Sequence, residues 1–334
     1  MKNTFKNKKN LIVYLAVLLV ACLLPLFFGG SSYIFSLVNL MLIYTISASG
    51  LDILFGYSGL ISLGHAGFYA LGAYGSALLS SLLNVPVIIS MFLGAILACL
   101  VGLALAYPAS KLKGHFLALV TIAFGEIIYL LLCHSPKGIT GDFSGFYGIP
   151  ALNLFGLKIK ENWQYFYVLL FFVVVTMFVK HRIVKSRVGR AFVAIRDNHD
   201  AAIGMGINIR KYRIMAFGIS AFITGFAGAL YAHMIRFVSP ETFTMNNISV
   251  PLVTIVLFGG MASQWGPAIG AVVVTLVGEI LQLTGTYQMI LYGLFVVIVL
   301  LFMPQGIMAT VKELFDRIMR SKKVKKAVST SAEN

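Results

Sequence analysis

The chain has 334 residues, of which 59% are hydrophobic and 11% are charged, with a net charge of +15 and a mean hydropathy of +0.91. A water-soluble domain of this length cannot enclose so much apolar surface, so the composition excludes a soluble globular protein. The sequence instead predicts an all-α fold, a polytopic transmembrane helical bundle.

Apolar segments follow one another along almost the whole chain. A bilayer core takes about 20 apolar residues per helix, and on this basis about ten spans are expected. They lie at residues 11–28, 33–55, 60–83, 86–107, 115–133, 164–180, 213–235, 248–261, 266–284 and 287–303.

The start of the chain resembles a secretory signal, because lysines precede an apolar run and residues 19–22 resemble a lipoprotein cleavage box. The apolar run continues past that box through Phe28, so the segment is expected to be retained as the first span. All three cysteines lie in apolar runs without metal-ligand spacing and are expected to act as small hydrophobic side chains: Cys22, Cys99 and Cys133.

Lysine and arginine are distributed unevenly over the connections. Four precede the first span, two lie at 108–114, nine lie between Lys180 and Arg213, and seven follow the last span. The remaining four fall in the alternate connections: Lys137, Lys158, Lys160 and Arg236. Because cytoplasmic loops retain positive charges, both termini are predicted to be cytoplasmic, which requires an even number of spans. Charges dispersed over short loops do not indicate a nucleic-acid-binding surface.

The spans are expected to form one membrane domain over residues 11–304. It lies between a cytoplasmic tail at 1–10 and a basic cytoplasmic tail at 305–334, which either touches anionic lipid or is simply solvated. The longest polar interruptions, near 134–163 and 181–212, divide the spans into two sets of five. This division is the pattern of a 5+5 inverted repeat with broken helices.

Glycine gathers in two interruptions of the apolar pattern, residues 56–67 and 259–267. Irregular backbone is tolerated at membrane depth only beside protein or a wet cavity, so these segments are candidates for a translocation pathway built from broken helices. The alternative is close helix packing at small residues, which is favoured for Gly72, Gly225 and Gly228. The candidate pathway residues are Gly56, Gly59, Ser62, Gly64, His65, Glu126, Gly259, Gly260, Gly266 and Pro267.

Asp52, Glu126 and Glu279 fall within or at the ends of predicted spans, where an ionisable group is costly unless it is paired or hydrated. Glu126 is the deepest of them, and it either pairs structurally or holds the amino group of a substrate. His65 is expected to hydrogen-bond the end of a broken helix, with proton relay as the alternative.

Residues 186–213 have the pattern of an amphipathic surface helix. Ser186 can cap it, and apolar residues recur at helical spacing on one face, at Val188, Phe192 and Ile195. Arg190 and Arg196 lie off this apolar face, and two glycines can end the helix, Gly204 and Gly206. The sequence predicts one helix over 187–204, which rests on the membrane, is solvated, or couples to a separate ATPase.

The sequence contains no phosphate-binding loop, no H-E-x-x-H pair and no C-x-x-C pair. The chain is therefore not expected to be an enzyme, and no catalytic residue, metal site or cofactor of its own is expected. Passage of a solute through the membrane is the function class that remains.

Several stretches, in the same order, resemble the permeases of branched-chain amino-acid ABC transporters. They are residues 57–74, 125–128, 186–206, 238–241, 258–267 and 287–306. The resemblance covers nearly the whole chain and is greater to the longer of the two paired permeases. Two positions depart from the common pattern. Leu60 stands where many members carry Gln, and Asp142 ends the motif Thr140-Gly141-Asp142, which is frequently Thr-Gly-Gly. Both weaken a substrate assignment, since urea and short-amide permeases are similar.

The resemblance implies an importer for Leu, Ile, Val or a related hydrophobic amino acid in a bacterial-type cytoplasmic membrane. Its partners would be a second, paralogous permease, two ATPases that bind ATP and Mg, membrane lipid, and an extracytoplasmic binding protein docking near 134–163 and 236–247. The resemblance also implies that coupling to the ATPases uses Gly189, Arg190, Ala194, Arg196, Asp197, Ala201, Ala202 and Gly204.

Other functions remain open at this point. A urea or short-amide permease would keep the mechanism and change the substrate. The competitor from a different class is a secondary transporter, in which an ion gradient drives uptake through a coupling carboxylate at Asp52, Glu126 or Glu279. An intramembrane enzyme lacks a catalytic constellation in this sequence, and the two glycine-rich interruptions argue against an accessory scaffold without a pathway.

Overall fold

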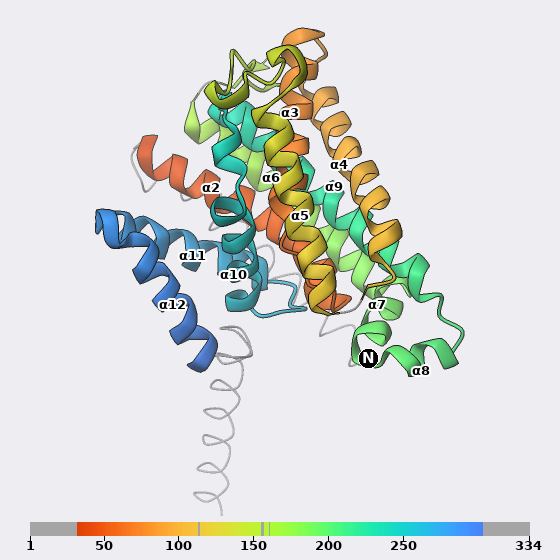
Figure 1. Cartoon of the computed structure of the whole chain (residues 1–334). Helices are drawn as coiled ribbons and strands as arrows, with labels where there is room; N and C mark the ends of the chain where they lie inside the picture. The colour runs from red at the N-terminus through yellow and green to blue at the C-terminus, as the bar shows by residue number, and fades with distance from the viewer. Residues whose placement is uncertain (1–31, 113, 155–156, 160, 303–334) are drawn as a thin grey trace, which may run out of the picture.

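In the computed structural model, which describes residues 32–302 apart from 113, 155–156 and 160, apolar helices follow one another with short connections (Figure 1). The α-helices are α2 (Ser32–Asp52), α3 (His65–Leu82), α4 (Val87–Ala109), α5 (His115–Cys133), α6 (Asn162–Lys185), α7 (Arg187–Asp197), α8 (His199–Gly204), α9 (Ile209–Ile235), α10 (Val250–Gly259), α11 (Gly266–Gln282) and α12 (Gln288–Phe302). Two π-helical turns adjoin them, η1 (Ile53–Tyr57) after α2 and η5 (Met245–Ser249) before α10.

The connections contain only short regular elements. The 3-10 turns are η2 (Pro136–Gly138), η3 (Asp142–Ser144), η4 (Pro240–Phe243) and η6 (Gly285–Tyr287). Strand β1 (Phe146–Tyr147) pairs antiparallel with β4 (Phe237–Val238), with Phe146 opposite Val238, and β2 (Asn153–Leu154) pairs antiparallel with β3 (Leu157–Lys158).

Five segments of the described residues are long and apolar enough to cross a membrane: Ser32–Tyr57, Val87–Ala109, His115–Cys133, Asn162–Lys185 and Ile209–Ile235. Shorter apolar helices follow at Met245–Gly259, Gly266–Gln282 and Gly285–Ile298. α3 is surrounded by protein, because 12 of its 18 residues are buried, and the hydroxyl group of Ser76 contacts Ser90 of α4 and His233 of α9. The expected all-α, multi-pass membrane protein is confirmed. The span expected at 11–28 and both tails lie outside the described residues.

Glycines let the backbones of the central helices approach closely. A Cβ atom on Gly72 of α3 would lie 1.9 Å from the carbonyl oxygen of Gly225 on α9. A Cβ atom on Gly228 of α9 would lie 2.0 Å from the carbonyl oxygen of Tyr69. The close packing expected for these glycines is therefore confirmed, and a larger side chain at either position would separate α3 from α9.

Two buried histidine–serine contacts join α3 to α9. His65 Nε2 lies 2.7 Å from Ser220 Oγ, and His233 Nε2 lies 2.7 Å from Ser76 Oγ. Both imidazoles are fully buried, so each needs such a partner in place of water. His65 and Ser220 lie toward the N-terminal ends of the two helices, and Ser76 and His233 lie toward their C-terminal ends. α3 and α9 therefore run parallel in a defined register.

α9 and α2 each pack against a consecutive pair of helices. α9 contacts α3 and α4, α2 contacts α10 and α11, and α2 and α9 also contact each other. α6 packs against α2. Figure 1 shows α11 and α12 on the opposite side of the bundle from α4.

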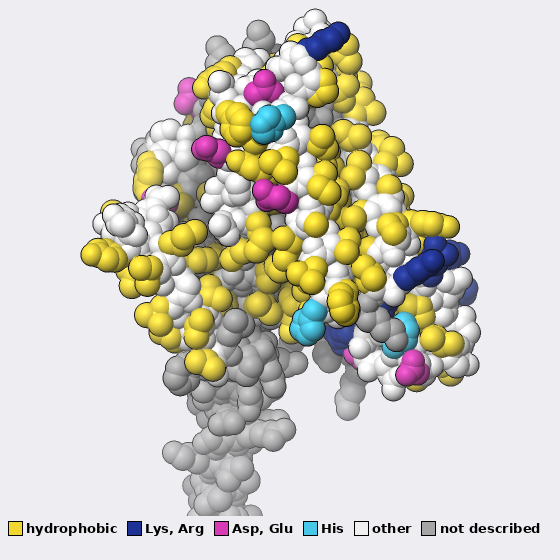
Figure 2. Space-filling view, viewed as in Figure 1, with side chains coloured by type: hydrophobic (Ala, Val, Ile, Leu, Met, Phe, Trp, Pro, Cys, Tyr) yellow, Lys and Arg dark blue, Asp and Glu magenta, His cyan; other side chains and the backbone are white. Residues whose placement is uncertain are grey.

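One end of the bundle holds α7, α8 and residues 57–64, 110–112 and 260–265, which are joined by contacts of Arg196 with Gly56, of Gly56 with Ala262 and of Arg213 with Ser110, and we call it the basic end. On the face in view, Figure 2 shows the Lys and Arg side chains gathered mainly beside α7 and α8. Arg213 in the second turn of α9 donates from Nη1 to the carbonyl oxygen of Ser110 at 2.9 Å, which joins α9 to the connection between α4 and α5. α9 begins at the basic end, and β4 follows its last turn, so the β1–β4 pair lies at the opposite end.

Two expected spans have different limits in the structure. The span expected at 60–83 begins only at His65, because the chain before it is irregular and turns at Gly59, whose φ is +69°. Glycine adopts this left-handed backbone without the steric penalty of a side chain. The span expected at 248–261 is a short helix formed by η5 and α10, which ends at Gly259 with the following glycine at a φ of +99°.

The helix expected over 187–204 is two helices, and the prediction of one continuous helix is wrong. Asn198 interrupts it with extended backbone at φ −154° and ψ 109°. Its side-chain oxygen accepts hydrogen bonds from the N–H groups of Asp200 and Ala201 at 3.1 and 3.0 Å, so it caps α8. Asparagine is among the favoured N-cap residues, and this cap starts a second helix at a point that the apolar periodicity does not mark.

Candidate functional site

α7 begins as the sequence predicts. Ser186 Oγ accepts hydrogen bonds from the N–H groups of Val188 and Gly189 at 3.1 and 3.4 Å, so the expected cap is confirmed. Phe192 and Ile195 are buried, and Phe192 packs edge-on against the ring of Tyr212 on α9 at a centroid distance of 6.2 Å. The apolar face of α7 thus binds the helix to the rest of this chain.

The eight candidate coupling residues divide into buried and exposed ones. Gly189 and Ala202 are buried. A Cβ atom on Gly189 would lie 2.2 Å from the carbonyl oxygen of Val184, so this glycine permits the sharp corner between α6 and α7. Ala194 is half-buried. The exposed members, which can meet another protein, are Arg190, Arg196, Asp197, Ala201 and Gly204.

Arg196 extends from α7 onto the first glycine-rich segment. Its Nη1 donates to the carbonyl oxygen of Gly56 at 2.8 Å. Its Nε and Nη2 donate to Asp197 Oδ1 at 3.0 and 2.8 Å. Gly59 packs on the same side chain, since a Cβ atom there would lie 2.8 Å from Arg196 Cγ. These contacts join the end of α7 to the end of α2.

Lys180 and Asp52 form a buried ion pair. Lys180 Nζ lies 2.7 Å from Asp52 Oδ2, and both side chains are 0% exposed. The nitrogen also lies 5.8 Å from the ring centroid of Tyr57, within the range of a cation–π contact. Lys180, counted from the sequence among the charges between the sixth and seventh spans, belongs to α6, and its side chain turns inward to reach the carboxylate.

The ion pair holds residues 260–265, the loop within the second glycine-rich segment. Asp52 Oδ1 accepts a hydrogen bond from the N–H of Ala262 at 2.8 Å. Lys180 Nζ donates to the carbonyl oxygen of Ser263 at 2.9 Å. A buried charge pair is stable only when further hydrogen bonds satisfy the donors and acceptors that the pair itself leaves free. The backbone of this loop supplies two of these hydrogen bonds.

The glycines of both segments serve close backbone packing. A Cβ atom on Gly56 would lie 2.5 Å from the backbone nitrogen of Ala262, so the two segments touch. A Cβ atom on Gly259 would lie 1.9 Å from the carbonyl oxygen of Gly266. Among the candidate pathway residues, the buried ones are Gly56, Ser62, Gly64, His65, Gly259, Gly260, Gly266 and Pro267. They shape the basic end of this chain and do not line an open passage within it.

His65 makes the helix-end contact expected of it. Its Nδ1 lies 3.0 Å from Ser62 Oγ, in the irregular segment that precedes α3, and its Nε2 lies close to Ser220. Both ring nitrogens are therefore engaged with hydroxyl groups of this chain. The geometry gives His65 a role in positioning the start of α3 against α9.

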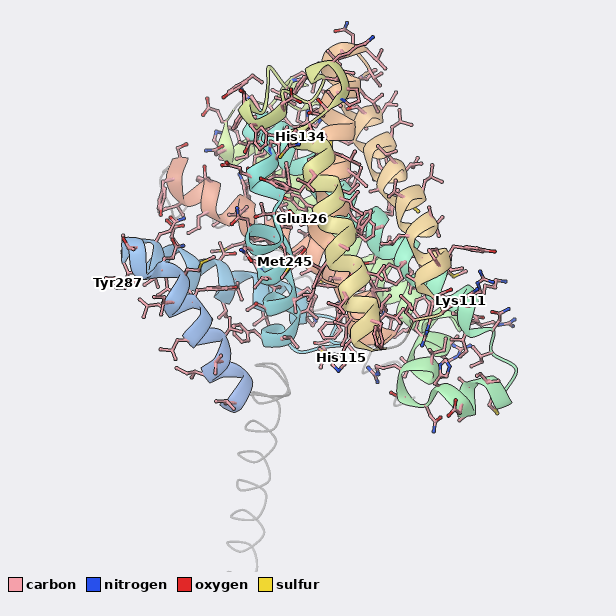
Figure 3. All side chains as sticks on the ribbon, viewed as in Figure 1. Lys111, His115, Glu126, His134, Met245 and Tyr287 are labelled. Atoms are coloured by element: carbon pink, nitrogen blue, oxygen red, sulfur yellow. The ribbon has the colours of Figure 1, made fainter. Side chains whose placement is uncertain are left out.

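Glu126 differs from the other pathway candidates because it is exposed. It lies near the middle of α5, on the face seen in Figure 3. Its exposed neighbours on that helix are apolar: Leu119, Ile127 and Leu130. Neither ion pair within the described residues involves it, so the structural pairing considered for Glu126 is not found there. The third carboxylate, Glu279, accepts a hydrogen bond from the hydroxyl of Tyr33.

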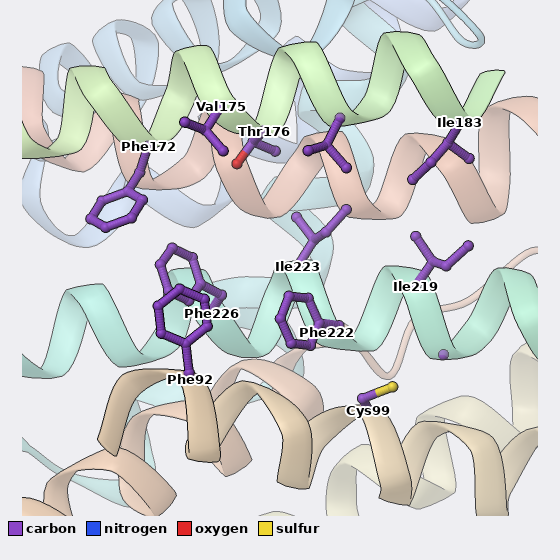
Figure 4. A pocket seen from close by; sticks show the side chains of 12 residues that line it. Phe92, Cys99, Phe172, Val175, Thr176, Ile183, Ile219, Phe222, Ile223 and Phe226 are labelled. Atoms are coloured by element: carbon purple, nitrogen blue, oxygen red, sulfur yellow. The ribbon is translucent and has the colours of Figure 1, made fainter. Parts of the chain in front are cut away.

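An apolar cavity of about 370 Å³ lies between α4, α6 and α9 (Figure 4). Phenylalanines line much of it: Phe92, Phe172, Phe222 and Phe226. Its lining carries one hydroxyl group, that of Thr176, and no charge. It therefore offers nothing to the charged groups of an amino acid. The described residues also contain no group of three His, Cys, Asp or Glu side chains that could hold a metal ion.

The two departures from the common pattern have local explanations. Asp142 Oδ1 accepts hydrogen bonds from the N–H and the hydroxyl of Ser135 at 3.0 and 2.8 Å, which closes the turn after α5. Leu60 is buried. In this structure both residues stabilise connections of the bundle.

Residues 33–302 match the family described as "Branched-chain amino acid transport system / permease component". The chain belongs to this family. This permease is 33% identical over 329 residues to LivM, a permease protein of the high-affinity branched-chain amino acid transport system of Escherichia coli (strain K12), covering 92% of this chain and 76% of the relative. It is 25% identical over 296 residues to the LivH permease protein of Salmonella typhimurium, covering 82% of this chain and 94% of the relative.

A more distant relative of this permease is the probable LivM of Methanocaldococcus jannaschii, 26% identical over 236 residues, which cover 66% of this chain and 67% of the relative. No solved structure gives a significant match. The family expected from the sequence is thus confirmed, and the chain is a transport permease component.

Sequence reasoning missed two features of the permease. It overlooked Lys180 as the partner of Asp52, although both charges lie at the ends of apolar runs, where each needs a partner. It also overlooked the part of Ala262 and Ser263, which act through backbone groups. No side-chain pattern marks such residues.

Proposed function

We propose that this permease imports Leu, Ile, Val or a related hydrophobic amino acid as one of two paired permease subunits of an ABC importer. Its similarity to both LivM and LivH, two permease proteins named for the same transport system, supports this pairing. In the proposal a second, paralogous permease completes the pathway, two ATPases use ATP and Mg, and an extracytoplasmic binding protein delivers the substrate. This chain binds no cofactor and no nucleic acid.

The proposed location is a bacterial-type cytoplasmic membrane, crossed ten times, with both termini and the basic end in the cytoplasm. The gathering of Lys and Arg beside α7 and α8 supports this orientation. The binding protein is then expected at the opposite end, near 134–163 and 236–247. The β1–β4 pair joins these two segments, which supports a single docking surface.

A 5+5 inverted repeat within residues 11–304 is supported by the packing of two helices. In a repeat of this kind α2 and α9 are the second spans of the two halves. α9 contacts α3 and α4, the third and fourth spans of the first half, and α2 contacts α10 and α11, their counterparts in the second half. Equivalent helices with exchanged but equivalent neighbours are the expected signature of internal symmetry.

α7 carries the functional proposal. It projects at the basic end, its cap and its buried phenylalanine hold it rigidly, and Arg190 on its outer surface is free of ion pairs within the described residues. A short helix presented in this way suits a groove of a partner protein. We assign it as the helix through which ATPase closure reaches the membrane domain, with α8 extending the contact.

The pathway is proposed to lie on the α5 face, between this chain and the second permease. A carboxylate that faced lipid at the middle of a span would cost a few kcal/mol, so Glu126 is expected to face protein and water. From there it can hold the amino group of the passing substrate. The basic-end glycines shape the access from the cytoplasm.

The experiment is uptake of labelled Leu, Val and urea by vesicles containing this chain, the second permease and the ATPases, with binding protein supplied outside. ATP is provided or withheld at the ATPase side, and the ion gradient is kept or dissipated. ATP-dependent uptake of Leu or Val that survives loss of the gradient is the expected result. ATP-dependent uptake of urea would instead establish the short-amide alternative.

Gradient-driven uptake without ATP would establish a secondary transporter and overturn the proposal. The structure already narrows that alternative. Asp52 is paired with Lys180, and Glu279 accepts a hydrogen bond from Tyr33. Glu126 then remains as the candidate coupling carboxylate of a secondary transporter. Removal of Glu126 should abolish gradient-driven uptake if that alternative is correct.

A further inference from the structure

A continuous series of contacts leads from α7 to the 260–265 loop. Arg196 donates to the carbonyl oxygen of Gly56 at 2.8 Å. Gly56 packs directly on the carboxylate of Asp52, since a Cβ atom on this glycine would lie 2.0 Å from Asp52 Oδ1. The same oxygen accepts the N–H of Ala262 at 2.8 Å. Lys180, the partner of Asp52, donates to the carbonyl oxygen of Ser263 in the same loop. Each residue of this series contacts the next one directly.

The 260–265 loop is held in a conformation that its sequence does not favour. Ala262 has a φ of +54°, in the left-handed region that residues with a side chain rarely adopt. Its N–H is the group bound by Asp52, and the side-chain amide of Gln264 donates to the carbonyl oxygen of Met177 on α6 at 2.7 Å. The loop therefore keeps this shape through contacts with α2 and α6, and it can change shape when they shift.

A change in this loop would reach the pathway face. The loop joins α10 to α11, and α10 continues from η5, which contacts α5. Figure 3 shows Met245, the first residue of η5, on the same face as Glu126 of α5. Movement of α10 would therefore alter the surface beside Glu126.

We infer that Arg196 is an internal link which transmits displacement of α7, through Gly56 and the Asp52–Lys180 pair, to the 260–265 loop. The loop then acts as the cytoplasmic gate of the permease. This inference rests on the proposed docking of α7 to an ATPase, and it removes Arg196 from the contact with that ATPase. Arg196 is a positioning residue in this scheme, whereas Arg190 meets the partner.

The experiment uses the full complex of both permeases and both ATPases in nanodiscs, with the native cysteines of this chain replaced. One reporter, Asp200→Cys on α8, follows docking, and a second, Met261→Cys in the loop, follows the gate. Both positions are exposed, so a maleimide can reach them. Maleimide reaction rates are compared with and without ATP and vanadate, alongside ATP hydrolysis and uptake of Leu.

Arg196→Gln should leave hydrolysis and the nucleotide response at position 200 intact, abolish the response at position 261, and lower uptake at least tenfold. Arg196→Lys should restore part of the uptake, because a lysine can still donate one hydrogen bond to Gly56. Gly59→Ala should reproduce the effect of Arg196→Gln with the charge unchanged, since the added methyl group displaces the arginine side chain and also strains the left-handed backbone at this position. Lys211→Gln, an exposed change at the start of α9, is the matched control.

A response at position 261 and full uptake in both Arg196→Gln and Gly59→Ala would overturn the inference. Loss of both responses together with hydrolysis would also overturn it, because Arg196 would then be an ATPase contact. If position 200 fails to respond even in the unaltered complex, the docking proposal itself fails. The two failures are therefore distinguishable.

Discussion

Lys180 and Asp52, far apart in the sequence, meet 2.7 Å apart where α6 and α2 approach the basic end, and neither side chain is exposed. Each charge lies in a helix that packs among apolar neighbours. The pair also holds two backbone groups of the 260–265 loop. Its loss therefore affects both the stability of the bundle and the position of a loop.

Lys180→Met should destabilise the permease, because it leaves the Asp52 carboxylate buried without a partner, at a cost of about 3–5 kcal/mol. The double variant Asp52→Leu/Lys180→Met should recover most of this loss, since it removes both charges. Thermal unfolding of the purified proteins in detergent, completed as a double-mutant cycle, measures the difference. Equal destabilisation in the single and the double variant would show that the lost backbone contacts, and not the unpaired charge, dominate.

Gly72→Ala should destabilise the contact of α3 with α9. The added methyl group would lie 1.9 Å from the carbonyl oxygen of Gly225, and overpacking of this kind costs about 1–3 kcal/mol. Gly278→Ala is the matched control, because a Cβ atom there meets nothing within 4 Å, and alanine favours a helix over glycine by about 0.5–1 kcal/mol. The two variants should shift the unfolding temperature in opposite directions. A shift in the same direction for both would contradict the close contact.

The positions of the long apolar helices along the chain could be predicted because membrane thickness sets the length of a span. The segment expected at 115–133 is α5, His115–Cys133. The short helices and loops at the basic end were harder to predict. Their limits depend on single hydrogen bonds, such as the cap that Asn198 gives to α8, and such bonds leave the hydropathy pattern unchanged.

The contacts of the candidate site also divide into those that the sequence predicts and those that it does not. Local chemistry predicted the Ser186 cap and the contact of His65 with the irregular segment before α3. It could not predict that Arg196 bonds to Gly56 or that Lys180 turns inward, because these contacts depend on how distant helices pack. The glycine-rich segments were noticed for their composition, yet only the packing shows that they touch each other.

Glu126→Gln should lower uptake of Leu without affecting stability. The carboxylate is exposed on α5 and pairs with no described residue, so its replacement removes no contact within the described part of the chain. A hydrogen bond to a charged substrate contributes about 1.5–3 kcal/mol, so transport efficiency should fall about 10- to 150-fold. Initial uptake rates over a range of binding-protein concentrations, together with unfolding temperatures, test this. Unchanged uptake would remove Glu126 from the pathway.

Arg190→Ala should weaken binding of the ATPases while insertion and folding remain normal. The side chain is exposed at the first turn of α7, where its contact within the described residues is one hydrogen bond from Nη1 to the carbonyl oxygen of Lys185 at 3.2 Å. An arginine that anchors an interface contributes about 2 kcal/mol or more, equivalent to about a 30-fold loss of affinity. Titration of purified ATPase onto the two permeases in nanodiscs measures this loss, with Lys211→Ala as the matched control. Equal affinity in the two variants would move the docking surface away from the outer face of α7 and leave α8 to carry the contact.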